Sequence, residues 1–157
     1  VYSNYKMPVI VSTHPRTQKR LEALGETFQH EDIRFLKPFG FFDYNKLQKE
    51  AFCAISDSGT ISEESAILNF PAVTLRKSIE RPEAIDKGSI VLTGLDPDVL
   101  MSSIEIVVTE HKLFGNREIP EEYKVENTSL RVLKLITGTA KLTSKWRGMD
   151  AFSRYDW

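Results

Sequence analysis

The sequence has almost no cysteine, no long apolar run and no net excess of charge of either sign. Cys53 is the only cysteine in 157 residues, and it lies in the apolar run 51–55, where a thiol usually behaves as a small buried hydrophobe. No run approaches the roughly 20 apolar residues of a membrane helix. Residues 1–6 also lack the charged and then apolar order of a signal peptide. We therefore expect a cytoplasmic protein that does not enter a membrane.

The balance of charge excludes further classes of partner. Lys and Arg number 21 against 22 Asp and Glu, which gives a net charge of -1. A protein without a basic field has little to attract nucleic acid or an anionic membrane surface. The spacing of His, Cys and carboxylate residues fits no metal site. We expect neither a nucleic-acid partner nor a metal ion.

Length and composition favour one domain, since 157 residues with 41% hydrophobic content supply one ordinary core. The chain begins on Val1 rather than on methionine, and a strand-like run follows within a few residues. We therefore expect it to be part of a longer protein. The prediction is one domain over residues 1–140, followed by a polar tail over residues 141–157.

Short β-branched runs alternate with helical patterns along the chain, which is typical of βα units around a parallel sheet. This alternation predicts the α/β class, with a Rossmann-like parallel sheet flanked by helices. An aromatic loop is expected at residues 38–42. The expected strands are 9–11, 33–36, 52–55, 72–75 and 90–92, and the expected helices are 16–29, 44–51, 61–69, 98–110 and 129–136.

A serine–glycine turn, residues 56–60, separates an apolar strand from a helix. The first amides of a helix have no partners within it and carry partial positive charge, so such a turn can bind a phosphate without a basic side chain. Gly59 lets an anion approach the backbone, and Ser58 is expected to donate a hydrogen bond to it. A nucleophile elbow is excluded, because G-x-S-x-G would need glycine at Ser56 and Thr60.

Two glutamates follow this turn, and the sequence gives them different roles. Thr60 and Glu63 fit a capping box, in which the Thr hydroxyl and the Glu carboxylate satisfy two amides of the first helical turn. We therefore expect Glu63 to be a helix cap. Glu64 lies about 100° further round the helix, which leaves it available to accept hydrogen bonds from sugar hydroxyls.

A charged segment, residues 75–84, follows the next strand and so lies at the same carboxyl edge of the sheet, where open α/β sheets bind ligands. Arg81 precedes Pro82, which keeps Arg81 out of helical geometry and suits the first position of a short helix. A guanidinium fixed at this point suits a diphosphate. The alternative is an exposed loop in which Arg81 pairs in solvent with Glu80 and Glu83.

These motifs together resemble the second half of the non-hydrolysing UDP-N-acetylglucosamine 2-epimerase family. The family pattern S-D-S-G-G-I-x-E-E, then G-x-P, then R-x-x-T-E-R-P-E is similar in order and spacing to residues 56–64, 69–72 and 76–84. Coarser similarity runs from about residue 7 to residue 136. Thr60 replaces the second glycine, and residues 65–70 replace A-P-x-L-G-K. Both departures resemble the branch that makes UDP-N-acetyl-L-fucosamine for capsule or O-antigen synthesis, which the turn at residues 12–17 also suits.

The resemblance implies the carboxyl-terminal half of a GT-B type fold, in which two Rossmann-like domains hold the nucleotide between them. In that family UDP is eliminated across C1 and C2 of the sugar and is added back on the other face. Ser58, Gly59 and Thr60 would then donate to the diphosphate. Glu64 would hold the ribose hydroxyls, and Arg81 would stabilise the charge that develops on the departing phosphate.

The resemblance also implies roles for two aromatic side chains and the absence of the domain that carries the catalytic acids and bases. Phe41, in the aromatic loop, would lie near the uracil, and His14 is a candidate effector or phosphate contact. The family's catalytic acids and bases lie in the amino-terminal domain, so only Arg81 is assigned a part in catalysis here and we expect this chain alone to be inactive. The implied partners are a UDP-sugar, the missing amino-terminal domain and, at full length, a second copy in a homodimer. No cofactor is implied.

Other interpretations stay open on the sequence. Within the family, interconversion of UDP-N-acetylglucosamine and UDP-N-acetylmannosamine is the other expected reaction. Half of a GT-B glycosyltransferase would share a ribose-binding carboxylate on a helix, but with a different motif spacing. A nucleotide-binding module without chemistry is the third interpretation.

Overall fold

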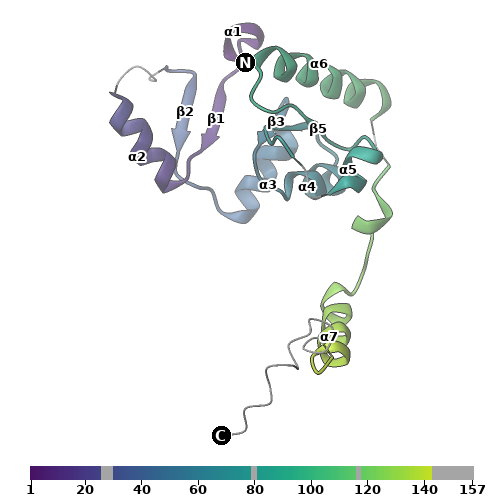
Figure 1. The fold of residues 1–157 in the computed structure, drawn as a ribbon. Helices are drawn as coiled ribbons and strands as arrows, with labels where there is room; N and C mark the ends of the chain where they lie inside the picture. The colour runs from purple at the N-terminus through teal and green to yellow at the C-terminus, as the bar shows by residue number, and fades with distance from the viewer. Residues whose placement is uncertain (26–29, 79–80, 116–117, 143–157) are drawn as a thin grey trace, which may run out of the picture. The chain divides into compact units, whose positions relative to one another are not determined.

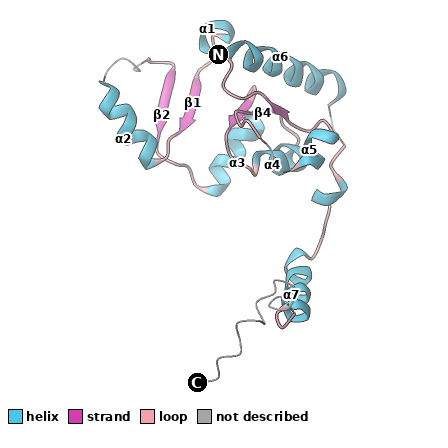
Figure 2. Cartoon of the chain, viewed as in Figure 1, coloured by secondary structure: helices cyan, strands magenta, loops and turns pink. Residues whose placement is uncertain are grey.

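The structure is a computed structural model that describes residues 1–25, 30–78, 81–115 and 118–142. Helices and strands alternate along the chain, as Figures 1 and 2 show. Within these residues the strands are β1 (Val9–Ser12), β2 (Ile33–Leu36), β3 (Ala54–Ser56), β4 (Ala72–Thr74) and β5 (Val91–Leu92). The α-helices are α1 (Tyr2–Tyr5), α2 (Pro15–Leu24), α3 (Phe41–Glu50), α4 (Ile61–Leu68), α5 (Pro82–Asp86), α6 (Pro97–Phe114) and α7 (Thr128–Thr139).

The strands form two parallel ladders. In one, β1 pairs with β2, with Val9 opposite Ile33. In the other, β4 lies between β3 and β5, with Val73 opposite both Ile55 and Val91. Parallel neighbours need a long crossover, usually a helix, and α2, α4 and α5 lie in the crossovers. Because β3 and β4 run parallel, the turns that follow them lie at the same edge of the sheet. The predicted parallel α/β class is confirmed.

The core centres on β4, which is buried along its whole length. Val73 packs against Ile104 and Val107 of α6, which are three residues apart and so lie on one face of that helix. Ile61, the first residue of α4, and Phe70, just after its end, are each 1% exposed. Burying side chains of this size stabilises the fold by about 1.5–3 kcal/mol each. This packing fixes the start of α4 relative to the ends of β3 and β4.

Two helix boundaries differ from the prediction on the amino-terminal side of the chain. α2 ends at Leu24 because Gly25 caps it with φ 72°, a conformation that favours glycine; residues 26–29 of the longer predicted helix lie outside the described residues. α3 begins at Phe41 rather than at Tyr44, with Gly40 as its N-cap. The predicted aromatic loop is therefore wrong at its end, where Phe41 and Phe42 form the first turn of a helix.

α6 is longer than the predicted helix over residues 98–110. It starts at Pro97 because the carboxylate of Asp96 accepts hydrogen bonds from the amides of Asp98 and Val99, at 2.9 and 3.2 Å. Proline at the first helical position and aspartate at the N-cap are both favoured there. Gly115, with φ 67°, ends the helix.

The second compact unit of the chain begins at Glu121. Its described part holds a 3₁₀ helix, Glu121–Tyr123, and α7, which includes the predicted helix over residues 129–136. The apolar side chains of α7 are exposed, Leu130, Leu133 and Ile136 among them. The predicted boundary at residue 140 stays a prediction, and residues 143–157 of the predicted polar tail lie outside the described residues. None of the described helices combines the length and the apolarity needed to span a membrane.

Candidate functional site

The turn between β3 and α4 is folded by its own hydroxyl groups. The amide of Ser58 donates to Ser56 Oγ at 3.0 Å, and the amide of Thr60 donates to Ser58 Oγ at 3.3 Å. α4 then starts at Ile61, and its first intrahelical bond runs from the amide of Glu64 to the Thr60 carbonyl. The amides before Glu64 have no carbonyl to bind within the helix, so the turn presents partial positive charge.

The predicted capping box is wrong. Thr60 is the N-cap residue, but its backbone has helical angles, φ -79° and ψ -10°, and its side chain makes no capping bond. Its hydroxyl donates instead to Glu64 Oε1 at 2.7 Å. Glu63, the predicted cap, accepts a hydrogen bond from Nε of Arg81. A charge-assisted bond to a guanidinium is stronger than a bond to a neutral amide, so the contact 18 residues away replaces the local cap.

Arg81 stands at the start of α5, with Pro82 at the first helical position as predicted. The bond to Glu63 directs its side chain toward α4, a contact that the alternative of pairing within an exposed loop does not include. Its side chain is 28% exposed and that of Glu63 is 29% exposed. The pair is therefore partly screened from water and holds the guanidinium near the serine–glycine turn.

Two guanidinium groups meet at Gly59. A Cβ atom added at Gly59 would lie 3.1 Å from Nη1 of Arg76 and 3.1 Å from Nη1 of Arg81. Arg76 follows β4, the strand that pairs with β3, so the parallel sheet itself brings it beside the turn. Because residue 59 is glycine, it has no side chain to push the two guanidiniums away from the turn. Each guanidinium carries five donors in a fixed plane, which suits an anion with several oxygen atoms.

Arg76 was not among the residues predicted for the site, although it lies within the motif that pointed to one. The signal was present in the sequence. A cation two residues after a fully buried strand must lie at the carboxyl edge of the sheet, where ligands bind.

α3 adds two side chains that the sequence analysis missed. Gln48 is 4% exposed, and its Nε2 donates to Glu64 Oε2 at 2.8 Å. Tyr44 lies one turn earlier on the same face of the helix. Partial burial raises the pKa of Tyr44 and the charge on Glu64 raises it further, while a hydrogen bond with Ser56 lowers it. The phenol is therefore neutral at physiological pH and lies among the polar groups of the turn.

Glu64 is the acceptor on which these bonds converge. Ser58 Oγ and Thr60 Oγ1 lie 3.0 Å apart, and since Thr60 gives its proton to Glu64, Ser58 must donate to Thr60. A chain of hydroxyls thus ends at one carboxylate oxygen, and Gln48 holds the other. Each oxygen keeps a second lone pair that can accept a bond from a ligand.

The remaining two predicted residues lie on other elements. Phe41, in the first turn of α3, is 76% exposed and meets Phe42 edge to face, with ring centroids 5.5 Å apart. His14 is the N-cap of α2, where its Nδ1 accepts from the amide of Arg16 at 3.2 Å. Ser58, Gly59, Thr60, Glu64 and Arg81 are brought together, whereas Phe41 contacts Phe42 and Asn45, and His14 contacts Arg16, all within four residues along the chain.

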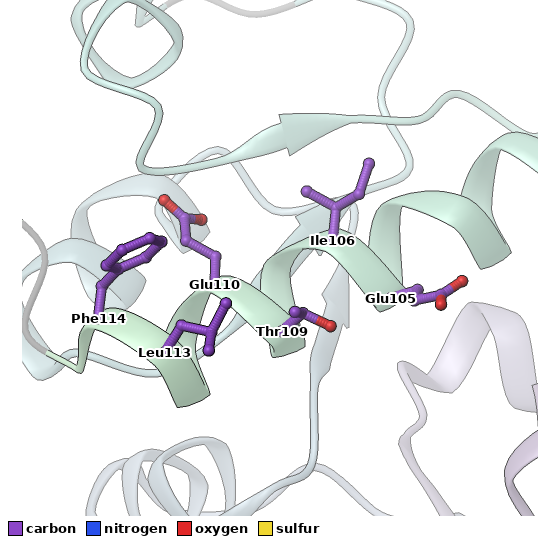
Figure 3. A pocket seen from close by; sticks show the side chains of 6 residues that line it. All are labelled: Glu105, Ile106, Thr109, Glu110, Leu113 and Phe114. Carbon is purple, nitrogen blue, oxygen red and sulfur yellow. The ribbon is translucent and has the colours of Figure 1, made fainter.

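A surface hollow of about 390 Å³ lies away from these residues (Figure 3). It is lined by side chains of α6 alone, which are Glu105, Ile106, Thr109, Glu110, Leu113 and Phe114. Open hollows on one helix do not converge polar groups as ligand sites do. Within the described ranges, no group of three or more His, Cys, Asp and Glu side chains has an arrangement that can hold a metal ion.

Taken chemically, the cluster has two halves with different preferences. Two guanidiniums and the first amides of α4 favour a polyanion at Gly59. Three residues beyond the start of that helix, Glu64 presents a carboxylate that repels an anion but accepts bonds from neutral hydroxyls. A molecule that carries phosphate groups next to a sugar meets both preferences.

The comparisons with known proteins agree with this chemistry. The family model described as UDP-N-acetylglucosamine 2-epimerase matches residues 1–137. A UDP-N-acetylglucosamine 2-epimerase of Methanococcus maripaludis is 35% identical over 119 residues, which are 74% of this chain and 32% of that protein. One of Methanocaldococcus jannaschii is 33% identical over 115 residues, 71% of this chain and 31% of that protein. The chain thus spans about a third of the length of these curated relatives.

Solved structures of UDP-N-acetylglucosamine 2-epimerases are also similar to this chain. The structure of UDP-N-acetylglucosamine 2-epimerase from Rickettsia bellii matches with a TM-score of 0.76 and 36% identity, over 92% of this chain and 40% of that one. The structure of the enzyme from Methanocaldococcus jannaschii matches with a TM-score of 0.69 and 29% identity, over 87% and 37%. The predicted fold, a Rossmann-like half of the GT-B type, is confirmed. The chain therefore belongs to the UDP-N-acetylglucosamine 2-epimerase family.

Proposed function

We propose that this chain is the nucleotide-holding half of a UDP-N-acetylhexosamine 2-epimerase, an isomerase that eliminates UDP from the sugar and adds it back with inversion at C2. Its sugar is the precursor of UDP-N-acetyl-L-fucosamine or the UDP-N-acetylglucosamine and UDP-N-acetylmannosamine pair. Its pathway is the synthesis of capsular polysaccharide or O-antigen precursors in the cytoplasm. The second domain of the complete protein supplies the acids and bases, and the complete protein is a homodimer.

The observation that carries this proposal is the meeting of Arg76 and Arg81 at Gly59. Both guanidiniums lie close to Gly59, at the carboxyl edge of the sheet where ligands bind, and their fixed donors suit the several oxygen atoms of a diphosphate. An elimination in which UDP leaves builds charge on the phosphate oxygen. Donors already directed at that oxygen stabilise the transition state more than the ground state.

The two halves of the cluster also orient the nucleotide. Ser58, Gly59 and Thr60 donate to the diphosphate from the turn, together with the amides at the start of α4; Ser58 and Thr60 do so by exchanging the bonds that they make within the turn and to Glu64. Thr60 holds the Glu64 carboxylate beside the turn. A ribose attached to a diphosphate bound at the turn would therefore lie near Glu64, which accepts from its hydroxyls. A ligand turned the other way would place phosphate against a carboxylate. Charge alone therefore favours one direction of binding.

Two further contacts complete the proposed site. Phe41 offers an exposed ring on which the uracil stacks, at the start of the helix that also carries Gln48. His14 accepts with Nδ1 from a backbone amide, which leaves its proton on Nε2 as a donor toward a phosphate or an effector. Both contacts are secondary to the diphosphate clamp.

The names of the relatives support UDP more firmly than any particular sugar. A relative from Pseudomonas aeruginosa, 29% identical over 96 residues, is a UDP-2,3-diacetamido-2,3-dideoxy-D-glucuronate 2-epimerase, whereas the relatives above act on UDP-N-acetylglucosamine. The names share the nucleotide and differ in the sugar. That pattern fits a chain whose cluster recognises phosphate and ribose.

Calorimetric titration of UDP into the whole chain tests the proposal. We expect binding by the unchanged chain, and a loss of about tenfold or more in affinity for Arg81→Ala and for Glu64→Ala, since each removes a charged hydrogen-bonding partner. Arg131→Ala is the matched control, because it removes an exposed arginine from α7 and should leave affinity unchanged. A folded chain without UDP affinity, or equal losses for Arg131→Ala and Arg81→Ala, would contradict the proposal.

A further inference from the structure

The inward polar face of α3 is the strongest feature that the proposed function leaves unused. Tyr44 and Gln48 are four residues apart and so share one face of the helix. Gln48 is directed at the serine–glycine turn through its bond to Glu64, and the pKa of Tyr44 is affected by Ser56 and by the charge on Glu64, which lie in or beside the same turn. The contact between Gln48 and Glu64 joins residues 16 positions apart in the chain.

The carboxylate of Glu64 is held at both oxygens. Oε2 accepts from Gln48 Nε2 at 2.8 Å, and Oε1 accepts from Thr60 Oγ1 at 2.7 Å. An ionised carboxylate only accepts hydrogen bonds, so the amide nitrogen of Gln48, rather than its oxygen, must face it. Two donors at opposite ends of the carboxylate fix its plane before any ligand arrives.

The burial of the Gln48 amide lowers the stability of the fold unless its polar atoms make hydrogen bonds. The residue is 4% exposed, and its Oε1 atom is buried without a hydrogen-bond partner among the described protein groups. A buried amide oxygen that makes no bond lowers stability. An apolar side chain such as methionine would fill the same space without that cost. The bond to Glu64 is therefore the reason that an amide stands here.

We propose that Gln48 is a positioning residue of the ribose site, which sets the plane of the Glu64 carboxylate so that its free lone pairs meet the ribose hydroxyls. The inference rests on the proposed assignment of Glu64 to the ribose. Gln48 itself touches no ligand. Its effect passes through Glu64 and is lost when either the carboxylate or the ribose hydroxyls are removed.

A ligand pair separates this role from a purely structural one. UDP carries both ribose hydroxyls, and 2′,3′-dideoxyuridine diphosphate carries neither, while the diphosphate and the uracil are the same. A residue that merely holds α3 against α4 would affect both ligands equally. A residue that positions Glu64 should affect only the ligand that uses Glu64.

The experiment is calorimetric titration of both ligands into the whole chain and its Gln48→Met variant. We expect Gln48→Met to lower the affinity for UDP about five- to tenfold, because part of a hydrogen bond's contribution to a charged group is lost. The affinity for dideoxy-UDP should change less than about twofold. The double variant with Glu64→Gln should bind UDP no more weakly than Glu64→Gln alone, because the two residues act as one unit. Equal weakening of both ligands by Gln48→Met, or no weakening of either, overturns the inference.

Two further variants keep the test decisive. Gln18→Met is the matched control, because Gln18 Nε2 likewise donates to a glutamate. Its partner is Glu22, at 3.0 Å on the exposed face of α2. This variant should bind both ligands as the unchanged chain does. Gln48→Asn retains the amide but is one methylene shorter, and it serves if Gln48→Met does not fold. It should show the same preference for weakening UDP, and equal effects on both ligands overturn the inference here too.

Failure of the proposed function has a different signature. If the unchanged chain binds UDP and dideoxy-UDP equally and Glu64→Gln has no effect, the ribose assignment of Glu64 is wrong, and the inference falls with it. If Glu64→Gln weakens UDP selectively and Gln48→Met does not, only the inference about Gln48 falls.

Discussion

Two turns of this chain look alike in local chemistry and differ in what surrounds them. One follows β1 and leads into α2, and the other follows β3 and leads into α4. The first holds His14, whose side chain bonds to the amide two residues on. The second receives Gln48 from α3, Arg76 from the end of β4 and Arg81 from the start of α5.

The difference shows that a turn at a helix start becomes a site only when other segments bring side chains to it. β3 has β4 as its parallel neighbour, so the residues after both strands meet at one edge. At the same edge of the β1–β2 ladder Lys37 follows β2, but the His14 side chain bonds to the amide of Arg16 in its own turn. Variants at four positions test this contrast, from the largest expected effect to the smallest.

Gly59→Ala should have the largest effect on nucleotide binding. Its added methyl group would lie 3.1 Å from Nη1 of both arginines, so the two guanidiniums must shift by a few tenths of an ångström from their places beside the turn. We expect UDP affinity to fall more than about tenfold, which is about 1.4 kcal/mol, in calorimetric titration. Gly40→Ala is the control, because its methyl group would meet nothing nearer than Asp43 Oδ2 at 3.9 Å. Equal binding by the two variants would remove Gly59 from the site.

Glu63→Gln should have the next largest effect, on stability. The pair with Arg81 is less than a third exposed on both sides, and its loss should lower the free energy of unfolding by about 1 kcal/mol, measured by urea denaturation. The control is Glu50→Gln, which breaks the pair of Lys46 and Glu50 at 3.7 Å, where both side chains are at least 70% exposed. An equal change in the two variants would mean that Arg81 is no better anchored than a surface lysine.

His14 tests whether the turn after β1 takes part in binding at all. Asparagine is a favoured N-cap and alanine is not, so His14→Ala should lower stability by about 0.5–1 kcal/mol, while His14→Asn should not. If the imidazole also contacts a phosphate, both variants should bind UDP about two- to threefold more weakly. Thermal unfolding and calorimetry on the same samples separate the two effects. Unchanged affinity in both would make His14 a helix cap and nothing more.

Tyr44→Phe should have the smallest effect, visible only at high pH. Burial raises the pKa of Tyr44 above its ordinary value, so the unfolded chain ionises first as the pH rises. The stabilising contribution is full below about pH 10, the ordinary pKa of tyrosine, and is lost as the pH approaches the raised value. Urea denaturation across that range should show that the free energy of unfolding falls less with rising pH in Tyr44→Phe than in the unchanged chain. Parallel losses would mean that the phenol is no more buried in the folded chain than in the unfolded one.

The fold was accessible from sequence because its signals are local. Apolar, β-branched runs such as residues 72–75 and 90–92 predicted strands within one or two residues of β4 and β5. Pro82 likewise predicted the start of α5. These signals depend on neighbours within a few positions, which the sequence shows directly.

The errors arose where a distant residue competes with a near one. Glu63 has the spacing of a cap, but Arg81, 18 residues on, offers a stronger partner. Gln48 has the polarity of a surface residue, and helical periodicity cannot say that its face is turned toward Glu64. Arg76 was overlooked for the same reason, since its place beside Gly59 follows from the pairing of β3 with β4.

The surroundings of Gly59 limit which residues can stand at this position during evolution. The described glycines with left-handed backbones are Gly25, Gly88, Gly94 and Gly115, and Gly59 is not one of them. Its backbone would accept any L-amino acid, so the pressure to keep glycine comes from the two arginines facing it. Substitutions at residue 59 should therefore covary with those at residues 76 and 81. A side chain larger than that of alanine at residue 59 should be found mainly where residue 76 or residue 81 is shorter than arginine.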